Sequence, residues 1–440
     1  MTAATPQTRP TNPMLSVLSL RDFRLLWIGQ GTSLIGDQFY LIAMPWLVLQ
    51  LTGDPLALGI AMALTGIPRV ICMIFGGAVS DRFSARAIML VSDLVRLFLM
   101  IGLTAMVLTG SVQLWMLYTF AVIFGGASGF FLPASNAIVP TLVPRENLEA
   151  GNSIFQGTTQ LSSFVGPALA GGVIAWFAHS LTSATGQTNT QSLLGISIAF
   201  GIDALTFIIS VVTLWMMASS TSHKGPVSTT MFESIRSGMS YLWNDSLLRM
   251  GFILIAIANF TFVGPLLVGI PVLAKTRLPE GAMGFGLIMS AYAAGNLTGI
   301  LSAGGLPKPN GQTMRFFIPV LLVAFGVCLV CLGWITSTWV AVVLLLVVGV
   351  GNGFLQITFI TFLQRRTPAD LLGRVMGLVL VANYGAVPLS QALSGALSKW
   401  NLTALFVIGG LLEMLLGVWA VMQPEMRTIG TVLAGQSTGD

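Results

Sequence analysis

Long apolar segments separated by short polar loops make up most of the chain. Twelve of these segments reach about 18 residues, the length that an α-helix needs to cross the ~30 Å hydrocarbon layer of a membrane. The pattern predicts an all-α membrane protein with twelve transmembrane helices. The segments lie near residues 25–50, 55–79, 87–109, 112–140, 150–177, 192–217, 249–273, 281–305, 315–335, 338–363, 371–397 and 402–423.

The composition supports a membrane protein and excludes a soluble one. Of the 440 residues, 55% are hydrophobic and only 8% are charged, whereas a soluble globular chain carries about 25% charge. Residues 1–19 lack the charged-then-apolar order of a cleaved signal. The three cysteines, Cys72, Cys328 and Cys331, all fall within apolar segments. We expect them to pack, and we expect no disulfide, metal or other cofactor.

The basic residues are unevenly divided between the two sides of the predicted membrane. If the amino terminus is cytoplasmic, fifteen lysines and arginines lie on the cytoplasmic side, and only Lys275, Arg277 and Lys399 lie on the other. This bias matches the positive-inside rule and places both termini in the cytoplasm. The net charge of +5 therefore sets orientation, and nucleic acid is not an expected partner.

The second half of the chain repeats the first. The glycine-rich segment 125–130 recurs as 349–354, and at the same offset Pro144, Glu146 and Leu148 meet Pro368, Asp370 and Leu372. Two halves in the same orientation are typical of secondary transporters. The sequence predicts two six-helix bundles, whose boundaries follow from the polar stretches. The predicted order is a disordered tail over 1–19, bundles over 20–217 and 249–423, a linker over 218–248, and a tail over 424–440.

The linker contains a pattern of its own. Phe232, Ile235, Met239 and Leu242 recur at helical spacing. This spacing indicates an amphipathic helix that lies on the cytoplasmic face of the membrane, although a plain connecting role is the alternative.

A short charged loop joins the second and third apolar segments. It reads G-x-x-x-D-R-x-x-x-R, with Gly77, Asp81, Arg82 and Arg86 at the lettered positions. This loop resembles the signature of the major facilitator superfamily, which runs G-x-L-A-D-R-x-G-R-K between helices two and three. The corresponding loop of the second half, residues 304–309, keeps its glycine but lacks the Asp-Arg pair.

The resemblance implies that this loop is a conformational latch. In the superfamily the loop aspartate docks near the start of the eleventh helix, so Asp81 would bridge the two halves. Here that helix looks as if it begins with Thr367 as its cap and Asp370 in its first turn. A carboxylate at a helix N-terminus is worth about 0.3–2 kcal/mol, and Arg82 and Arg86 would hold the loop and lipid phosphates. The alternative is a solvated loop with no docking role.

Six charged residues lie within the apolar segments, where each needs a partner, a wet cavity or a neutral form. In the superfamily helices 1, 4, 7 and 10 line the central cavity. By that resemblance Asp37, the acid within helix 1, is the best-placed proton-coupling group. We expect the partner of Asp37 to be Arg69 of helix 2. The alternative is that the two form a purely structural ion pair with no role in proton coupling. For the other four charges we favour structural roles, and Asp93 and Arg96, spaced i,i+3 on one face of a helix, are expected to pair with each other. In chain order, the six are Asp37, Arg69, Asp93, Arg96, Asp203 and Glu413.

Helix 5 carries a second motif. Gly166, Pro167 and Gly171 resemble the antiporter signature G-P-x-x-G-G of exporters in this superfamily. Ala170 replaces one glycine of that signature. Close packing of small residues between helices is the alternative explanation.

The expected substrate cavity combines a few amide and aromatic side chains with largely apolar walls. The chain has 21 methionines and few intramembrane charges, a composition that suits hydrophobic and variable ligands. The residues expected to contact substrate are Gln38, Tyr40, Asn136, Asn259, Phe260, Gln356 and Asn383.

Several further motifs are similar to those of the macrolide, multidrug and siderophore exporters of the superfamily. They are Gly36-Asp37, Leu51-Thr52-Gly53, Asp93-Leu94-Val95-Arg96, Pro133-Ala134 and residues 143–148.

This resemblance implies a monomeric, proton-coupled antiporter of a bacterial cytoplasmic membrane, with protons, amphipathic small molecules and membrane lipids as partners. A lipid or lysolipid flippase and a siderophore exporter of the same fold are the alternatives, and a non-transporting sensor is a third. An intramembrane enzyme is disfavoured, because His179 and His223 both fall in loops.

Overall fold

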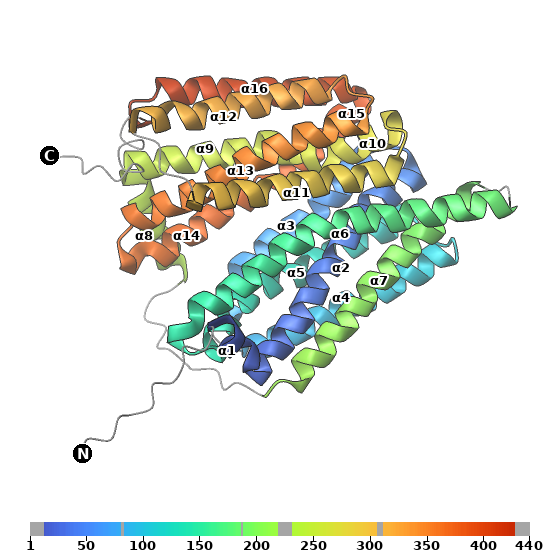
Figure 1. The fold of residues 1–440 in the computed structure, drawn as a ribbon, viewed down its shortest axis with the longest axis horizontal. Helices are drawn as coiled ribbons and strands as arrows, with labels where there is room; N and C mark the ends of the chain where they lie inside the picture. The colour runs from blue at the N-terminus through green and yellow to red at the C-terminus, as the bar shows by residue number, and fades with distance from the viewer. Residues whose placement is uncertain (1–12, 81–82, 186–187, 219–230, 306–310, 427–440) are drawn as a thin grey trace, which may run out of the picture.

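A computed structural model describes residues 13–80, 83–185, 188–218, 231–305 and 311–426 (Figure 1). Within these ranges twelve helical segments are long and apolar enough to cross a membrane, which confirms the predicted number. No β-strand occurs in the described ranges. The predictions for residues 1–12 and 427–440 lie outside the described residues.

The first half of the molecule contains six long helices. Among the described residues, the breaks at 53–54, 109–113 and 143–147 are short and polar, because Gly, Pro and Asp interrupt the apolar segments there. The long helices are α2 (Arg21–Thr52), α3 (Pro55–Ser80), α4 (Ala85–Leu108), α5 (Leu114–Leu142), α6 (Leu148–Thr185) and α7 (Thr188–Met216), with a short α1 (Pro13–Ser19) and a single 3₁₀ turn η1 (Arg145–Asn147).

The second half contains the other six spans, two of which are interrupted. Pro265 and Pro271 remove backbone donors, and the seventh span accordingly changes to a π-helical segment in its middle. The eleventh span breaks between Tyr384 and Val387. The elements are α8 (Met231–Asn244), α9 (Ser246–Gly264), η2 (Pro265–Gly269), α10 (Ile270–Arg277), α11 (Gly281–Gly305), α12 (Gly311–Leu332), α13 (Thr338–Arg366), α14 (Ala369–Tyr384), α15 (Val387–Trp400) and α16 (Leu402–Met422).

The internal repeat is visible in the helix boundaries and in the packing. Both ends of α5 lie 224 residues before the corresponding ends of α13. The repeated glycines allow close approach, because a Cβ on Gly125 would lie 2.1 Å from the carbonyl oxygen of Thr65 in α3. A Cβ on Gly349 would likewise lie 2.2 Å from the carbonyl oxygen of Tyr292 in α11. The repeat therefore preserves one helix crossing in each half.

The two bundles meet at one end of the molecule and diverge at the other (Figure 1). We call these the closed end and the open end, and the N-half and C-half are the bundles formed by α2–α7 and α9–α16. The halves contact each other mainly through α6 with α11 and through α3 with α15; we call these two contacts the seam. The open end holds the start of α2, the end of α7 and the start of α9. The helices of the two halves therefore lie further apart at that end.

Two predictions about the flanking segments need correction. Residues 13–19, expected to be disordered, form α1, and Val17 is fully buried beside Phe23 and Leu214. The linker helix is present as α8, but its apolar side chain Leu242 is fully buried in a cluster with Leu378 of α14. Leu242 and its neighbour Met239 therefore pack on the protein rather than on lipid, because α14 offers them an apolar surface.

Candidate functional site

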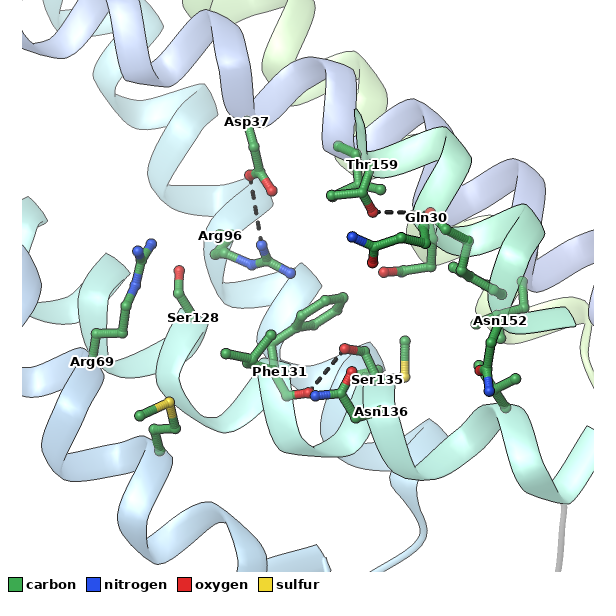
Figure 2. Close-up of a pocket in the computed structure, with 18 of the residues that line it drawn as sticks. Gln30, Asp37, Arg69, Arg96, Ser128, Phe131, Ser135, Asn136, Asn152 and Thr159 are labelled. Carbon is green, nitrogen blue, oxygen red and sulfur yellow. Dashed lines mark hydrogen bonds and ion pairs between the residues drawn. The ribbon is translucent and has the colours of Figure 1, made fainter. Parts of the chain in front are cut away.

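A cavity of about 1090 Å³ lies between the halves. Side chains of α2, α3, α4, α5 and α6 line it, and Tyr384 of α14 contributes from the opposite half. Figure 2 shows Asp37 and Arg96 pointing toward each other as a pair at the edge of this cavity, with Asn136, Asn152 and Thr159 also on its wall. We call it the N-half cavity.

The charges of the N-half cavity are centred on Arg96. This side chain is only 3% exposed, and its Nη1 lies 3.8 Å from Oδ1 of Asp37, whose side chain is 37% exposed. Its Nη2 donates to Oδ1 of the fully buried Asp93. The guanidinium also lies over the rings of Phe131 and Phe207, 4.2 and 4.6 Å from their centroids. One arginine therefore serves two acids, and the aromatic rings compensate part of its lost hydration.

The two acids differ in how tightly they are held. Ser210 of α7 donates to Oδ2 of Asp93 at 2.5 Å, and Gln30 donates to the Ser210 hydroxyl at 3.4 Å. Asp93 is therefore satisfied on both oxygens, as a buried charge must be. Asp37 faces the cavity and has a longer contact. It is the acid that is free to exchange its partner.

Arg69 does not pair with Asp37, contrary to the prediction from the sequence. It lines the same cavity, but Figure 2 shows it across the cavity beside Ser128. It lies within ion-pair distance of no acid in the described ranges. Arg96 takes the predicted role instead, because α4 brings it up to Asp37 while it also holds Asp93.

Asp203 is a further buried acid of the N-half. It is fully buried in the contact between α7 and α2, where a Cβ on Gly36 would lie 2.4 Å from its Oδ1. Thr206 donates to the same Oδ1 at 3.4 Å. Oδ2 has no hydrogen-bond partner among the described residues. Asp203 is therefore a third acid of this region, after Asp37 and Asp93, and it packs against the residue that precedes Asp37.

A second cavity, of about 360 Å³, lies in the C-half between α9, α11, α12, α13, α14 and α16. We call it the C-half cavity. Asn259, Gln356 and Asn383 line it, in agreement with the sequence, and Asn259 donates to the side-chain oxygen of Asn383 at 3.2 Å. Tyr384 lines both cavities, so the two adjoin there.

Three residues expected to contact substrate line neither cavity. Gln38 packs against Gly166 of α6, and the ring of Tyr40 lies 4.4 Å from that of Phe124. The carbonyl of Phe260 accepts a hydrogen bond from Ser390. Tyr40 lies about one turn from Asp37 toward the closed end, where packed side chains fill the space between helices. Of the expected set, Asn136 lines the N-half cavity.

The motif on α6 forms part of the seam. A Cβ on Gly171 would lie 2.6 Å from the carbonyl oxygen of Ala282, and one on Gly286 would lie 2.3 Å from that of Pro167. Ser290 of α11 accepts a hydrogen bond from the backbone N–H of Ala168 of α6 at 2.9 Å. The small residues thus bring the backbones of the two halves into direct contact.

Only part of the predicted latch lies within the described residues. Asp81 and Arg82 lie outside the described residues, so their docking stays a prediction, while Gly77 lies in the last turn of α3. Arg86 donates to the carbonyl oxygens of Leu214 and Trp215, both at 2.7 Å. It therefore neutralises the C-terminal end of α7, as expected for a cation there.

The predicted cap of the eleventh helix is wrong. Pro368 occupies the N-cap position of α14, and the hydroxyl of Thr367 has no hydrogen-bond partner within the described ranges. Thr367 instead ends α13, where its backbone N–H donates to Leu363. Asp370 still falls in the first turn of α14 by its position in the sequence.

The sequence did not reveal the contacts that hold the closed end. Lys399 donates to Oδ2 of Asp54 at 2.8 Å, and Lys275 donates to the carbonyl oxygen of Leu49. Both contacts join the C-half to the N-half. The hydrogen bond from Lys399 lowers the pKa of Asp54 from its ordinary value. The sequence did contain one indication of these contacts, because Lys275 and Lys399 are two of the only three basic residues predicted on the non-cytoplasmic side of the membrane.

Two repeated six-helix bundles around a shared cavity define a multi-pass membrane transporter rather than an enzyme. The chain belongs to the Major Facilitator Superfamily, whose family model matches residues 26–391. It is similar to the multidrug efflux pump Tap of Mycolicibacterium fortuitum, with 25% identity over 95% of this chain and 98% of that protein. It is also 24% identical to the enterobactin exporter EntS of Escherichia coli, over 85% of both chains.

Solved structures show the same fold at low identity. A mutant of the nucleoside transporter NupG matches with a TM-score of 0.71 and 14% identity, over 91% of this chain and 100% of that one. A bacterial homologue of the iron transporter ferroportin, in an inward-facing state, matches with a TM-score of 0.68 and 16% identity, over 92% and 99%.

Proposed function

We propose that this chain is a proton-coupled antiporter that exports hydrophobic or amphipathic small molecules by alternating access. Family membership makes it a transporter, and two relatives carry the names of exporters. The resemblance of the α6 motif to the antiporter signature also supports export. We propose a bacterial cytoplasmic membrane, with the open end facing the cytoplasm as the distribution of basic residues indicates.

The observation that carries the proposal is the shared arginine at the cavity wall. Arg96 holds the buried Asp93 closely and the more exposed Asp37 loosely. Protonation of Asp37 removes one of these contacts and leaves the other, so Arg96 never becomes an unpaired buried charge. The attraction between α2 and α4 then depends on the protonation of a group that the cavity exposes. That dependence is a physical route from proton binding to helix movement.

The test is transport by the Asp37→Asn variant, which keeps the shape of the side chain but cannot release a proton. In an efflux-deficient bacterium, wild type should lower the accumulation of amphipathic dyes, and a protonophore should abolish this effect. We expect Asp37→Asn to lose proton-driven efflux at unchanged protein level.

The matched control is Glu146→Gln, a change at an exposed acid in η1 that should retain efflux. Proton-driven export by Asp37→Asn at the wild-type rate would exclude Asp37 as the coupling group. A panel in which no compound is exported would exclude the proposed function.

A lipid or lysolipid flippase is the second candidate, and one observation favours it. An apolar groove of about 880 Å³ lies along the seam between α6 and α11, lined by Trp176, Phe177, Met283 and Leu287 among others. Such a groove is suited to acyl chains that enter from the side. Translocation of a fluorescent lysolipid in proteoliposomes, compared with dye efflux, separates the two candidates. A siderophore exporter, the third alternative, is distinguished by including enterobactin among the compounds tested.

A further inference from the structure

The C-half cavity contains one acid and no basic side chain among its described lining residues. That acid is Glu413 of α16, which is fully buried. Its Oε2 accepts a hydrogen bond from Thr261 of α9, and its Oε1 has no partner in the described part of the chain. A buried carboxylate with a single hydroxyl partner is incompletely satisfied.

The contrast with the N-half is informative. There the acids Asp37 and Asp93 share the guanidinium of Arg96, so the protein itself supplies the counter-charge. Glu413 has no such cation within ion-pair distance among the residues that the structure describes. The position that a cation would occupy lies at the wall of a cavity, where a ligand can supply it.

Aromatic rings line the same cavity as Glu413. Phe262, on the same helix as Thr261, has its ring centroid 6.0 Å from that of Tyr292 and 6.2 Å from that of Phe325. All three rings line the cavity together with Glu413. Aromatic faces attract organic cations, the more so when water is excluded. A carboxylate beside several rings is the combination that recognises an amine or another organic cation.

A metal ion fits this wall poorly. Metal sites need several oxygen, nitrogen or sulfur ligands around one ion. No cluster of three or more acidic, histidine or cysteine side chains occurs in the described ranges. The remaining walls are apolar, with amide groups from Asn259, Gln356 and Asn383. This surrounding suits a bulky organic ion with one charge.

We propose that the C-half cavity binds the charged group of amphipathic organic cations, with Glu413 as the counter-charge and Phe262, Tyr292 and Phe325 as the aromatic wall. Thr261 orients the carboxylate by its hydrogen bond. The remainder of the ligand extends past Tyr384 toward the N-half cavity, because Tyr384 lines both. This inference rests on the proposed export function and names a substrate class for it.

The experiment measures equilibrium binding of two probes of similar shape to the purified full-length protein. Tetraphenylphosphonium carries a single positive charge, and triphenylphosphine oxide is neutral. We expect Glu413→Gln to weaken binding of the cation by about tenfold or more, the effect of losing one partner of a buried charge pair. Binding of the neutral probe should change by less than about twofold, because its apolar contacts remain.

The matched control is Glu280→Gln. Glu280 likewise accepts a hydrogen bond from a threonine, Thr338, but it lines neither cavity. This variant should bind both probes as wild type does. If Glu413→Gln does not fold, Phe262→Leu tests the same proposal, because it removes a ring and should weaken binding of the cation more than of the neutral probe.

Three results would overturn the inference. They are unchanged cation binding by Glu413→Gln, an equal loss for both probes, and an effect of Glu280→Gln as large as that of Glu413→Gln. The proposed function is judged separately, by dye efflux in cells. Efflux of neutral compounds without selective cation binding would refute only the present inference. Selective cation binding without efflux of any compound would refute only the proposed function.

Discussion

The guanidinium group of Arg96 forms two ion pairs of different strength. With the fully buried Asp93 it forms a short-range pair within one turn of α4, and with the partly exposed Asp37 it forms a longer contact to another helix. Removing one member of a buried pair costs about 3–5 kcal/mol, so Asp93 and Arg96 depend on each other for folding. Asp37 can lose its contact at much lower cost. The exposed acid is therefore the one suited to titrate during a transport cycle.

The Asp54–Lys399 pair gives a prediction about pH. The pKa of Asp54 is lowered from its ordinary value of 3.8 because Lys399 donates a hydrogen bond to it. A lowered pKa means that the pair stabilises the closed end above about pH 4 and that this stabilisation is lost as the pH falls through the shifted pKa. The side chains of Asp54 and Lys399 are 30% and 54% exposed. We therefore expect the pair to contribute about 0–1 kcal/mol to the free energy of unfolding.

The measurement is thermal unfolding of the purified protein as a function of pH, for wild type and for Asp54→Asn. The variant should be slightly less stable at pH 7, and the difference should disappear at low pH. High salt should also reduce the difference, because the pair is partly exposed. A difference that grew as the pH fell would contradict the assignment.

At the level of single residues, the sequence located the charges and the Asp93–Arg96 pair, but not the partner of Asp37. A charged residue within an apolar segment stands out, so Asp37, Asp93, Arg96 and Glu413 were all found. The choice between Arg69 and Arg96 as the partner of Asp37 depends on how α2, α3 and α4 are rotated against one another. That rotation is set by packing, which a linear pattern does not contain.

At the level of helices, small residues decide how closely the halves approach. On α6, Gly171 lies against the backbone of Ala282, and on α11, Gly286 lies against that of Pro167. Glycine is needed at these positions because any side chain would meet backbone rather than a flexible side-chain end. The seam is therefore a direct backbone contact between the two halves.

This contact predicts the effect of a larger side chain. Gly171→Val would place its Cβ 2.6 Å from the carbonyl oxygen of Ala282, and overpacking of this kind costs about 1–3 kcal/mol. We expect it to force α6 and α11 apart and to reduce the initial rate of dye efflux by about tenfold. Protein level and monodispersity should be measured in parallel.

The neighbouring glycine provides the control for this prediction. A Cβ on Gly172 would meet only Sδ of Met283, at 3.6 Å, which is an ordinary contact. Gly172→Ala should therefore transport like wild type. Equal behaviour of Gly171→Val and Gly172→Ala would show that the close approach at the seam does not matter for transport.

Over the whole molecule, the closed end joins the halves while the open end separates them (Figure 1). Alternating access requires the closed end to open at another stage of the cycle. Asp54 lies between α2 and α3, and Lys399 lies in the last turn of α15. A covalent link between these two positions would hold the halves in the arrangement described here.

We therefore predict that cross-linking this pair stops transport. In a variant whose three native cysteines are replaced by serine, Asp54→Cys and Lys399→Cys would be joined by a short bis-maleimide. Dye efflux should fall to background, while binding of tetraphenylphosphonium from the open end should persist. Single-cysteine variants treated with the same reagent should transport normally. Efflux at the wild-type rate by fully cross-linked protein would show that the closed end need not open.

The sequence by itself determined the number of spans, the two-fold repeat and the presence of rare charges in the membrane. These features depend on hydrophobic length and composition, which are local properties of the chain. Only the tertiary structure decided that Arg96 pairs with Asp37, that Asp203 packs against the neighbouring Gly36 and that Glu413 has no cation of its own among the described residues. Those relationships depend on the rotation and crossing of helices that lie far apart in the sequence, and helix packing fixes them.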